Sequence, residues 1–357
     1  MPDINDPADT TSIAPSTSRA LVTESSSLVR RGLALAEALL SRQDAEGYYK
    51  SGREKERQDK YLQAVEDFTH AIESDPDFAD AYSMRAWCFG HLKERQKQLQ
   101  DRDAVVRLRP HDDVAYVHRA MCHEILCNYE EALRDYTRAI ELAPEKAADR
   151  YQMRGELFRE LGKYQEAIDD FTRISAYSLR GHIFCELGKY QEAIDDFTRA
   201  SAYLSRGQVH YHLGHLEEAI NDYTREIAQE TYAAGWDIEP SYWRGLAYED
   251  LGRYQDAIQD YSHVLELNRE YNERVYYRRY YIYSAYLHRG FAYHKLNMYQ
   301  DAIQDYSRVI ELNRKYRGED GGRYYDSAYW LRGVAYHKLN MVAEAFDDYR
   351  QAAHLGK

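Results

Sequence analysis

The sequence predicts an all-α fold: a right-handed superhelical solenoid of about nine helix-turn-helix repeats, two of them shortened to a 26-residue spacing. One observation is a recurring sequence motif, which reads Arg-Gly, then Leu-Gly-x-Tyr, then Ala-Ile-x-Asp followed by an aromatic residue. Another is the spacing of the later alanine and the aromatic residue four positions on, which places both on one face of a helix. Such internal repetition is typical of arrays in which each unit buries its apolar face against its neighbours.

A small residue marks the first helix of each unit, and we interpret it as a packing position without a catalytic role. Glycine or alanine leaves room where the second helix presses in. The markers step by 34, 34, 35, 26, 26, 38, 45 and 43 residues. They are Gly52, Ala86, Ala120, Gly155, Gly181, Gly207, Gly245, Gly290 and Gly333.

The two 26-residue steps lack the proline-containing connection between units. Tyr177 comes only three positions after Ile174, so we expect a very tight turn, shortened helices and a local change in superhelical twist. A continuous helix through this segment is the competing outcome. Residues 160–173 and 186–199 are identical, which indicates duplication and offers recombination as the origin of the irregular spacing.

The residue pattern resembles the tetratricopeptide repeat family over residues 45 to about 353. The first unit carries the pattern at Tyr48, Gly52, Ala64, Phe68, Ala71 and Pro76, and the second, at Ala86, is degenerate. The resemblance implies that the first helices line a concave groove for an extended or helical peptide. It implies no cofactor.

Composition narrows the class of function. The net charge of -13 disfavours a protein that binds a phosphate backbone. Cys88, Cys122, Cys127 and Cys185 fall in expected helices without a disulfide spacing, so we interpret them as reduced thiols. No secretory signal or membrane span is evident, and we expect a cytoplasmic protein.

Three segments are predicted along the chain. Residues 1–27 are a Ser/Thr-rich tail expected to be disordered. Residues 28–44 form an amphipathic N-terminal capping helix, with contact to a membrane surface as the alternative. Residues 45–357 form the repeat array.

An arginine precedes the small residue in eight units, and an aspartate precedes the second-helix aromatic position in all nine. We favour structural ion pairs between the packed helices, because the two residue types occur together. The alternative is a ladder of guanidinium groups for an acidic peptide.

Chaperone-binding members of the family hold two carboxylates with Lys and Asn residues, and that set is absent here. The corresponding positions are Tyr49, Arg53, Val114 and His118. The groove-facing positions are aromatic and apolar toward the C-terminus instead, where exposed side chains would mark an interaction site. The candidates are Tyr242, Trp243, Leu246, Leu287, His288, Phe291, His294, Trp330, Val334 and His337.

Two further patterns have weaker functional interpretations. Seven tyrosines in residues 271–286, with interleaved arginines, favour either an extended helix or RNA binding. His118, Cys122, His123 and Cys127 resemble metal ligands, but their helical spacing keeps the two pairs about 100° apart. We predict no metal site and no enzyme, since no catalytic motif occurs.

We therefore expect a scaffold or adaptor that binds peptide segments of partner proteins. A non-catalytic regulatory subunit that tethers an enzyme to its substrate is the alternative. Few residues follow Tyr349, so the last unit is predicted to be uncapped and to self-associate or dock a partner.

Overall fold

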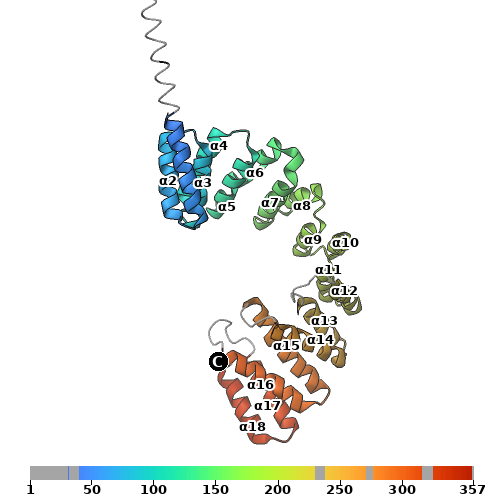
Figure 1. Cartoon of the computed structure of the whole chain (residues 1–357). Helices are drawn as coiled ribbons and strands as arrows, with labels where there is room; N and C mark the ends of the chain where they lie inside the picture. The colour runs from blue at the N-terminus through green and yellow to red at the C-terminus, as the bar shows by residue number, and fades with distance from the viewer. Residues whose placement is uncertain (1–30, 32–39, 230–237, 271–275, 316–324, 356–357) are drawn as a thin grey trace, which may run out of the picture. The chain divides into compact units, whose positions relative to one another are not determined.

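The computed structural model describes residues 31, 40–229, 238–270, 276–315 and 325–355, and these form an all-α protein. Contacts divide the chain into two compact units, Met1–Asp170 and Phe171–Lys357. Within each unit, consecutive helices lie side by side in chain order (Figure 1).

The first unit begins with the helix at residues 40–57 and continues through α2 (Tyr61–Ser74), α3 (Ala79–His91), α4 (Arg95–Leu108), α5 (Asp113–Ile125), α6 (Tyr129–Leu142), the 3₁₀ helix η1 (Pro144–Lys146) and α7 (Ala147–Glu160). Helix α8 (Tyr164–Arg173) contains the boundary between the units. The second unit contains α9 (Tyr177–Glu186), α10 (Tyr190–Ala200), α11 (Tyr203–His212), α12 (Leu216–Ala228), α13 (Ile238–Asp250), α14 (Tyr254–Glu270), α15 (Tyr276–Lys295), α16 (Tyr299–Lys315), α17 (Tyr325–Lys338) and α18 (Val342–Leu355).

Taken in pairs, the described helices form the nine predicted repeats. The handedness of the superhelix stays a prediction. Residues 1–27 and most of the expected capping helix lie outside the described residues. Its described part, residues 40–44, continues without a break to residue 57, so no helix end separates it from the first repeat at Ala45.

The small marker residues lie against the ring of the second helix, as predicted. A Cβ atom added to Gly290 would lie 2.7 Å from Cε1 of Tyr306, a residue that is fully buried. Gly52, Gly181, Gly207, Gly245 and Gly333 face a ring 16 residues later in the same way. Glycine therefore lets the two helices of a repeat approach closely.

The tight turn between the short repeats is confirmed, and the continuous helix is wrong. Helix α8 ends at Arg173 and α9 begins at Tyr177. Ser175 adopts a positive φ of 54°, and the Ala176 N–H donates to the Phe171 carbonyl at 2.9 Å. Helices α8 to α11 are only 10 or 11 residues long. The change in superhelical twist stays a prediction.

Each repeat turns from its first to its second helix through one residue in the left-handed region. Glycine fills this position in four repeats, at φ between 70° and 76°. In the other five it is Asp59, Lys93, Cys127, Asn297 and Asn340, at φ between 58° and 63°. Cys127 thus lies in a turn after α5, and its expected place within a helix was wrong.

Replacing Lys93 with Gly is expected to raise the free energy of unfolding by about 0.5–1 kcal/mol, because only glycine adopts this conformation without a steric cost. Urea unfolding followed by circular dichroism measures the change. Lys97→Gly, at an exposed position inside α4, is the matched control and should destabilise the protein by about 1 kcal/mol. A lower midpoint for Lys93→Gly would contradict the assignment of this turn.

Candidate peptide-binding surface

The arginines that precede the small residues are held by aspartates 16 positions later. Arg289 donates from Nε to Oδ2 and from Nη2 to Oδ1 of Asp305, both at 2.8 Å. This two-point geometry gives a strong charge-assisted pair. The same pairs are Arg85–Asp101, Arg119–Asp135, Arg154–Asp170, Arg180–Asp196, Arg206–Asp222, Arg244–Asp260 and Arg332–Asp348.

The third nitrogen of these arginines connects one repeat to the previous one. Nη1 of Arg289 donates to the Ser262 hydroxyl on α14 at 2.9 Å, and Nη1 of Arg332 donates to Ser307 on α16 at 2.9 Å. The structural ion pairs are therefore confirmed. The ladder of arginines for an acidic ligand is wrong, because these guanidinium groups are already bonded on both sides.

Two of the ten candidate groove residues are part of the core, so their expected exposure was wrong. Tyr242 is 3% exposed and Leu287 is 9% exposed. The Tyr242 hydroxyl lies 2.6 Å from the Ser284 hydroxyl on α15, and its ring packs edge-on against Tyr281. The first helix of the following repeat covers this position, so it cannot face a ligand.

The other eight candidates retain accessible surface. Trp330 and His337 are exposed, and the remaining six are half-buried: Trp243, Leu246, His288, Phe291, His294 and Val334. Some already have polar neighbours within the second unit. His288 Nδ1 lies 3.2 Å from both carboxylate oxygens of Glu249, and Lys295 lies over the Phe291 ring at 4.9 Å.

The first unit has an apolar surface that the sequence reasoning missed. Trp87, Met121 and Ile125 are 49%, 43% and 51% exposed, and we call these three residues the apolar stripe. Trp87 on α3 and Met121 on α5 each directly follow the small marker residue, so they occupy equivalent positions in successive repeats. Ile125 lies one turn after Met121 on the same face of α5. Exposed side chains of this size usually mark an interaction site.

The signal for this stripe was present in the sequence. Leu246, Phe291 and Val334, all named as candidates, also directly follow the small residue of their repeats. The same rule applied to repeats two and three selects Trp87 and Met121. Around them, Tyr49 packs on Phe68 and Phe78, and Arg53 Nη1 lies 2.9 Å from the Met84 sulfur.

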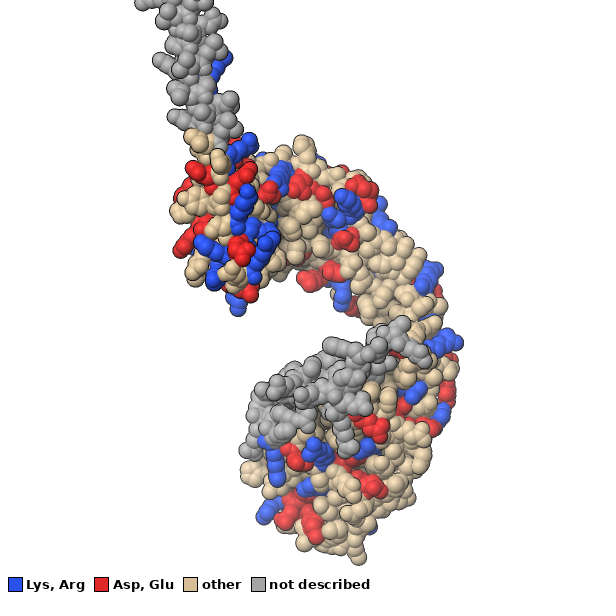
Figure 2. All heavy atoms as spheres, in the orientation of Figure 1, with Lys and Arg blue, Asp and Glu red and all other residues tan. Residues whose placement is uncertain are grey.

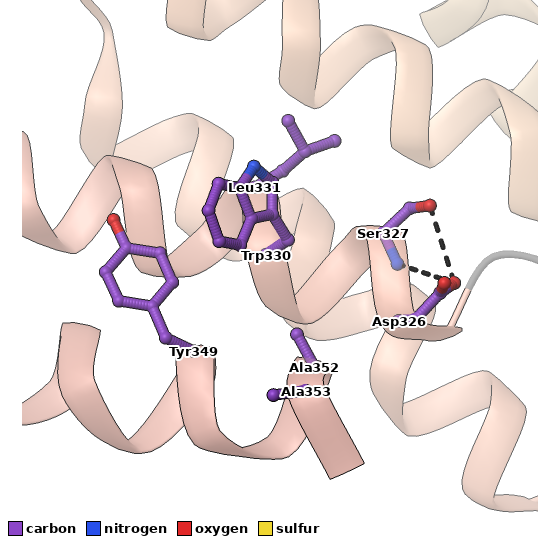
Figure 3. A pocket seen from close by; sticks show the side chains of 7 residues that line it. All are labelled: Asp326, Ser327, Trp330, Leu331, Tyr349, Ala352 and Ala353. Atoms are coloured by element: carbon purple, nitrogen blue, oxygen red, sulfur yellow. Dashed lines mark hydrogen bonds between the residues drawn. The ribbon is translucent and has the colours of Figure 1, made fainter. Parts of the chain in front are cut away.

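An apolar face also lies at the end of the second unit. Trp330 is 56% exposed, although it is equivalent to the buried Tyr242 and Leu287. A cavity of about 480 Å³ lies between α17 and α18, where Trp330 and Tyr349 stand side by side above Ala352 and Ala353 (Figure 3). Phe346, also on α18, is 66% exposed. Within the described residues, no helix covers this face.

The metal and nucleic-acid interpretations concern the His/Cys cluster of α5 and the Tyr-rich segment, residues 271–286. No group of three His, Cys, Asp or Glu side chains among the described residues is arranged to hold a metal ion. Of the tyrosines in this segment whose side chains are described, Tyr281 and Tyr283 are buried, Tyr286 is half-buried and Tyr280 is exposed. Basic and acidic side chains are interspersed on the face shown in Figure 2.

Comparison with known families agrees with the repeat geometry. The tetratricopeptide repeat family matches residues 49–113, 114–146, 148–175, 179–235, 241–271 and 283–316. The chain belongs to the tetratricopeptide repeat (TPR) family. It is therefore a TPR array, which is a protein-interaction domain. None of the described helices has the length and apolar character needed to cross a membrane.

Similar proteins match only parts of this TPR array. The DnaJ homolog subfamily C member 7 homolog of Dictyostelium discoideum is 31% identical over 145 residues, which are 36% of this chain and 27% of that protein. The Hsp70-Hsp90 organizing protein of Triticum aestivum is 28% identical over 26% of this chain and 16% of its own length. The chain thus spans about a quarter or less of these relatives. A solved tetratricopeptide repeat protein from Parabacteroides merdae is 16% identical and covers 82% of this chain and 99% of its own, with a TM-score of 0.41.

Proposed function

We propose that this TPR protein is a non-catalytic scaffold or adaptor that binds peptide segments of partner proteins along its first helices. The exposure of the apolar stripe on α3 and α5 carries this proposal. Most of the rings that pack against the small marker residues are buried. Trp87, Met121 and Ile125 lie instead on the surface of two neighbouring first helices, where exposed apolar side chains mark an interaction site.

The spacing of the stripe favours a short amphipathic segment as the ligand. Met121 and Ile125 lie one helical turn apart, and Trp87 comes from the neighbouring repeat. An amphipathic helix or an extended strand can place alternate apolar side chains against such a surface. Aromatic residues such as Trp87 commonly contribute a large share of the binding energy.

The second unit supplies a separate set of candidate contacts. We propose that Trp243, Leu246, Phe291, Trp330 and Val334 contribute to ligand binding, with His288, His294 and His337 beside them. Trp330 also belongs to the apolar face at the end of α17 and α18. Self-association through that face stays a prediction, as does a cytoplasmic location.

Two alternative functions remain distinct from peptide scaffolding. One relative is named Hsp70-Hsp90 organizing protein, which makes chaperone segments a candidate class of partner. They would have to bind without the Lys and Asn set of the chaperone-binding members, because Tyr49, Arg53, Val114 and His118 stand at those positions. A regulatory subunit would instead hold one enzyme and its substrate together. RNA binding through the Tyr-rich segment is the weaker alternative, and salt-dependent binding of oligonucleotides would distinguish it.

Affinity capture from native cell extract tests the proposal. Two variants are compared with the wild type: Trp87→Ala/Met121→Ala in the first unit and Trp243→Ala/Phe291→Ala/Trp330→Ala in the second. We expect the first variant to reduce capture of the bound proteins at least 10-fold, because alanine removes the contact area of two anchors. Leu62→Ala, at an exposed apolar residue of α2, is the matched control. Capture that is unchanged in both variants would contradict binding along the first helices.

A further inference from the structure

The outer face of the last helix is left uncovered by the described residues. In the repeat before it, α17 packs on α16, and Ile303 of α16 is 6% exposed. The equivalent residue of α18, 43 positions later, is Phe346, and it is 66% exposed. Apolar residues spaced by three or four positions lie on one face of a helix. We call those on the outer side of α18 the end face, which consists of Val342, Phe346, Tyr349 and Ala353.

The last repeat also lacks the residue that receives a following repeat. In the first eight repeats, the side chain 17 positions after the small marker residue accepts a hydrogen bond from Nη1 of the arginine of the next repeat. These acceptors are Thr69, Asp103, Thr137, Thr172, Thr198, Thr224, Ser262 and Ser307. In repeat nine this position is Arg350, whose guanidinium only donates. A further repeat of the same pattern would place a second guanidinium beside it, so α18 is not suited to such a cover.

The charges beside the end face are complementary to those of a second, antiparallel copy. Asp347, Arg350 and His354 follow one edge of α18, with the acid nearer the N-terminus and the bases nearer the C-terminus. When two such helices pack antiparallel about a two-fold axis, this edge meets the same edge of the other copy in reverse order. With the axis midway between positions 346 and 353, Asp347 of one copy lies beside Arg350 and His354 of the other. Within one chain, the Asp347 and Arg350 side chains are 3.4 Å apart but 68% and 65% exposed, so both can reach a second copy.

The shape of the end face is self-complementary about the same axis. Phe346 and Ala353 are seven residues, or about two turns, apart on one face, so Phe346 of one copy lies opposite Ala353 of the other. Ala353 lines the cavity of about 480 Å³ between α17 and α18. Figure 3 shows its wall, the rings of Trp330 and Tyr349, above Ala352 and Ala353, and the two ring centroids are 5.0 Å apart. A projecting ring on one half of α18 thus meets a cavity over small residues on the other half.

We propose that a second copy of this chain covers the end face, with the two α18 helices antiparallel about a two-fold axis and each Phe346 inserted into the cavity of the other copy. This inference specifies the predicted self-association and goes beyond peptide binding, because it uses the outer face of a second helix. A two-fold contact uses the same surface on both copies, so the assembly closes at two chains. Each dimer then presents two apolar stripes, which raises the avidity for a partner with two binding segments.

Sedimentation velocity of the full chain tests the dimer. We expect the wild type to be mainly dimeric at about 100 µM and mainly monomeric at about 1 µM, because one helix pair makes a small interface. Phe346→Asp should be monomeric at both concentrations, with an unchanged circular dichroism spectrum, since the side chain is exposed. Leu62→Asp is the matched control, at an apolar residue of α2 that is 69% exposed, and should dimerise like the wild type.

A mixing experiment tests the antiparallel geometry. Asp347→Arg and Arg350→Asp, each alone, should weaken the dimer at least about 10-fold, because each places like charges opposite one another twice across the axis. An equimolar mixture of the two variants should recover the wild-type affinity, since every new charge then faces an opposite charge. Energy transfer between the two variants, each labelled with a different fluorophore, measures the mixed dimer.

The outcomes distinguish this inference from the proposed function. A wild type that stays monomeric at the higher concentration would overturn the dimer and leave the end face to a helix of another protein. Dimers that persist in Phe346→Asp, or a mixture that does not recover, would overturn the assigned contact. Oligomers that grow beyond two chains would indicate head-to-tail stacking instead and would also overturn it. None of these results affects capture through the apolar stripe, and Trp87→Ala/Met121→Ala should dimerise like the wild type.

Discussion

Replacing Arg289 with Met is expected to lower the free energy of unfolding by about 3–5 kcal/mol, because it leaves the buried carboxylate of Asp305 without its counter-charge. Asp305 is 5% exposed, and both of its oxygens accept hydrogen bonds from Arg289. Urea unfolding at pH 7 measures the loss. The double variant Arg289→Met/Asp305→Leu should recover a large part of it, since no charge then stays buried.

The pH dependence of this loss follows from the direction of the pKa shift. Burial raises the pKa of Asp305 above its ordinary value of 3.8, and the guanidinium of Arg289 opposes that rise. Without Arg289, the pKa in the folded state rises further above the pKa in the unfolded state. The variant is therefore least destabilised at acid pH, where Asp305 is protonated, and the loss grows as the pH rises through the folded-state pKa.

A surface ion pair supplies the control for this cycle. Arg308 and Glu311 on α16 are 2.6 Å apart, but their side chains are 41% and 67% exposed. Arg308→Met should therefore change the free energy of unfolding by less than about 0.5 kcal/mol. An equally small effect for Arg289→Met would mean that the repeated Arg–Asp pairs do not stabilise the array.

Gly290→Val is expected to lower the free energy of unfolding by about 1–3 kcal/mol through overpacking. Even a single Cβ atom at this position would lie 2.7 Å from the Tyr306 ring, and valine adds two further methyl groups. The ring is fully buried, so it has little room to move away. Urea unfolding of the variant measures the effect.

The matched change in an open position should act in the opposite direction. A Cβ atom added to Gly47, in the helix at residues 40–57, meets nothing within 4 Å. Gly47→Ala should therefore stabilise the protein by about 0.5–1 kcal/mol through helix propensity alone. If Gly290→Val left the free energy of unfolding unchanged, the close contact between the two helices would not explain why the marker position is small in every repeat.

Much of the fold could be predicted from sequence because the same pattern of packing residues recurs in nine repeats. The 16-residue spacing between Arg289 and Asp305 recurs in each Arg–Asp pair. Because the two residue types occur together in eight repeats, the sequence already favoured an ion pair between the two helices of a repeat. The short connection at Ile174 likewise predicted a turn. Here local spacing alone decides the backbone geometry.

The binding surface was harder to predict because exposure depends on the next repeat. Tyr242 and Trp330 occupy equivalent positions, yet α15 covers Tyr242 and no described helix covers Trp330.

Photo-crosslinking from the apolar stripe tests the central claim most directly. Met121 is replaced by p-benzoylphenylalanine, and the protein is irradiated with its captured partners. A second protein carries the same group at Glu131, which is exposed on the second helix α6. We predict crosslinks from position 121 to a short segment of the partner that carries apolar side chains, and few from position 131. Equal crosslinking from both positions, or crosslinking from position 131 alone, would contradict binding along the first helices.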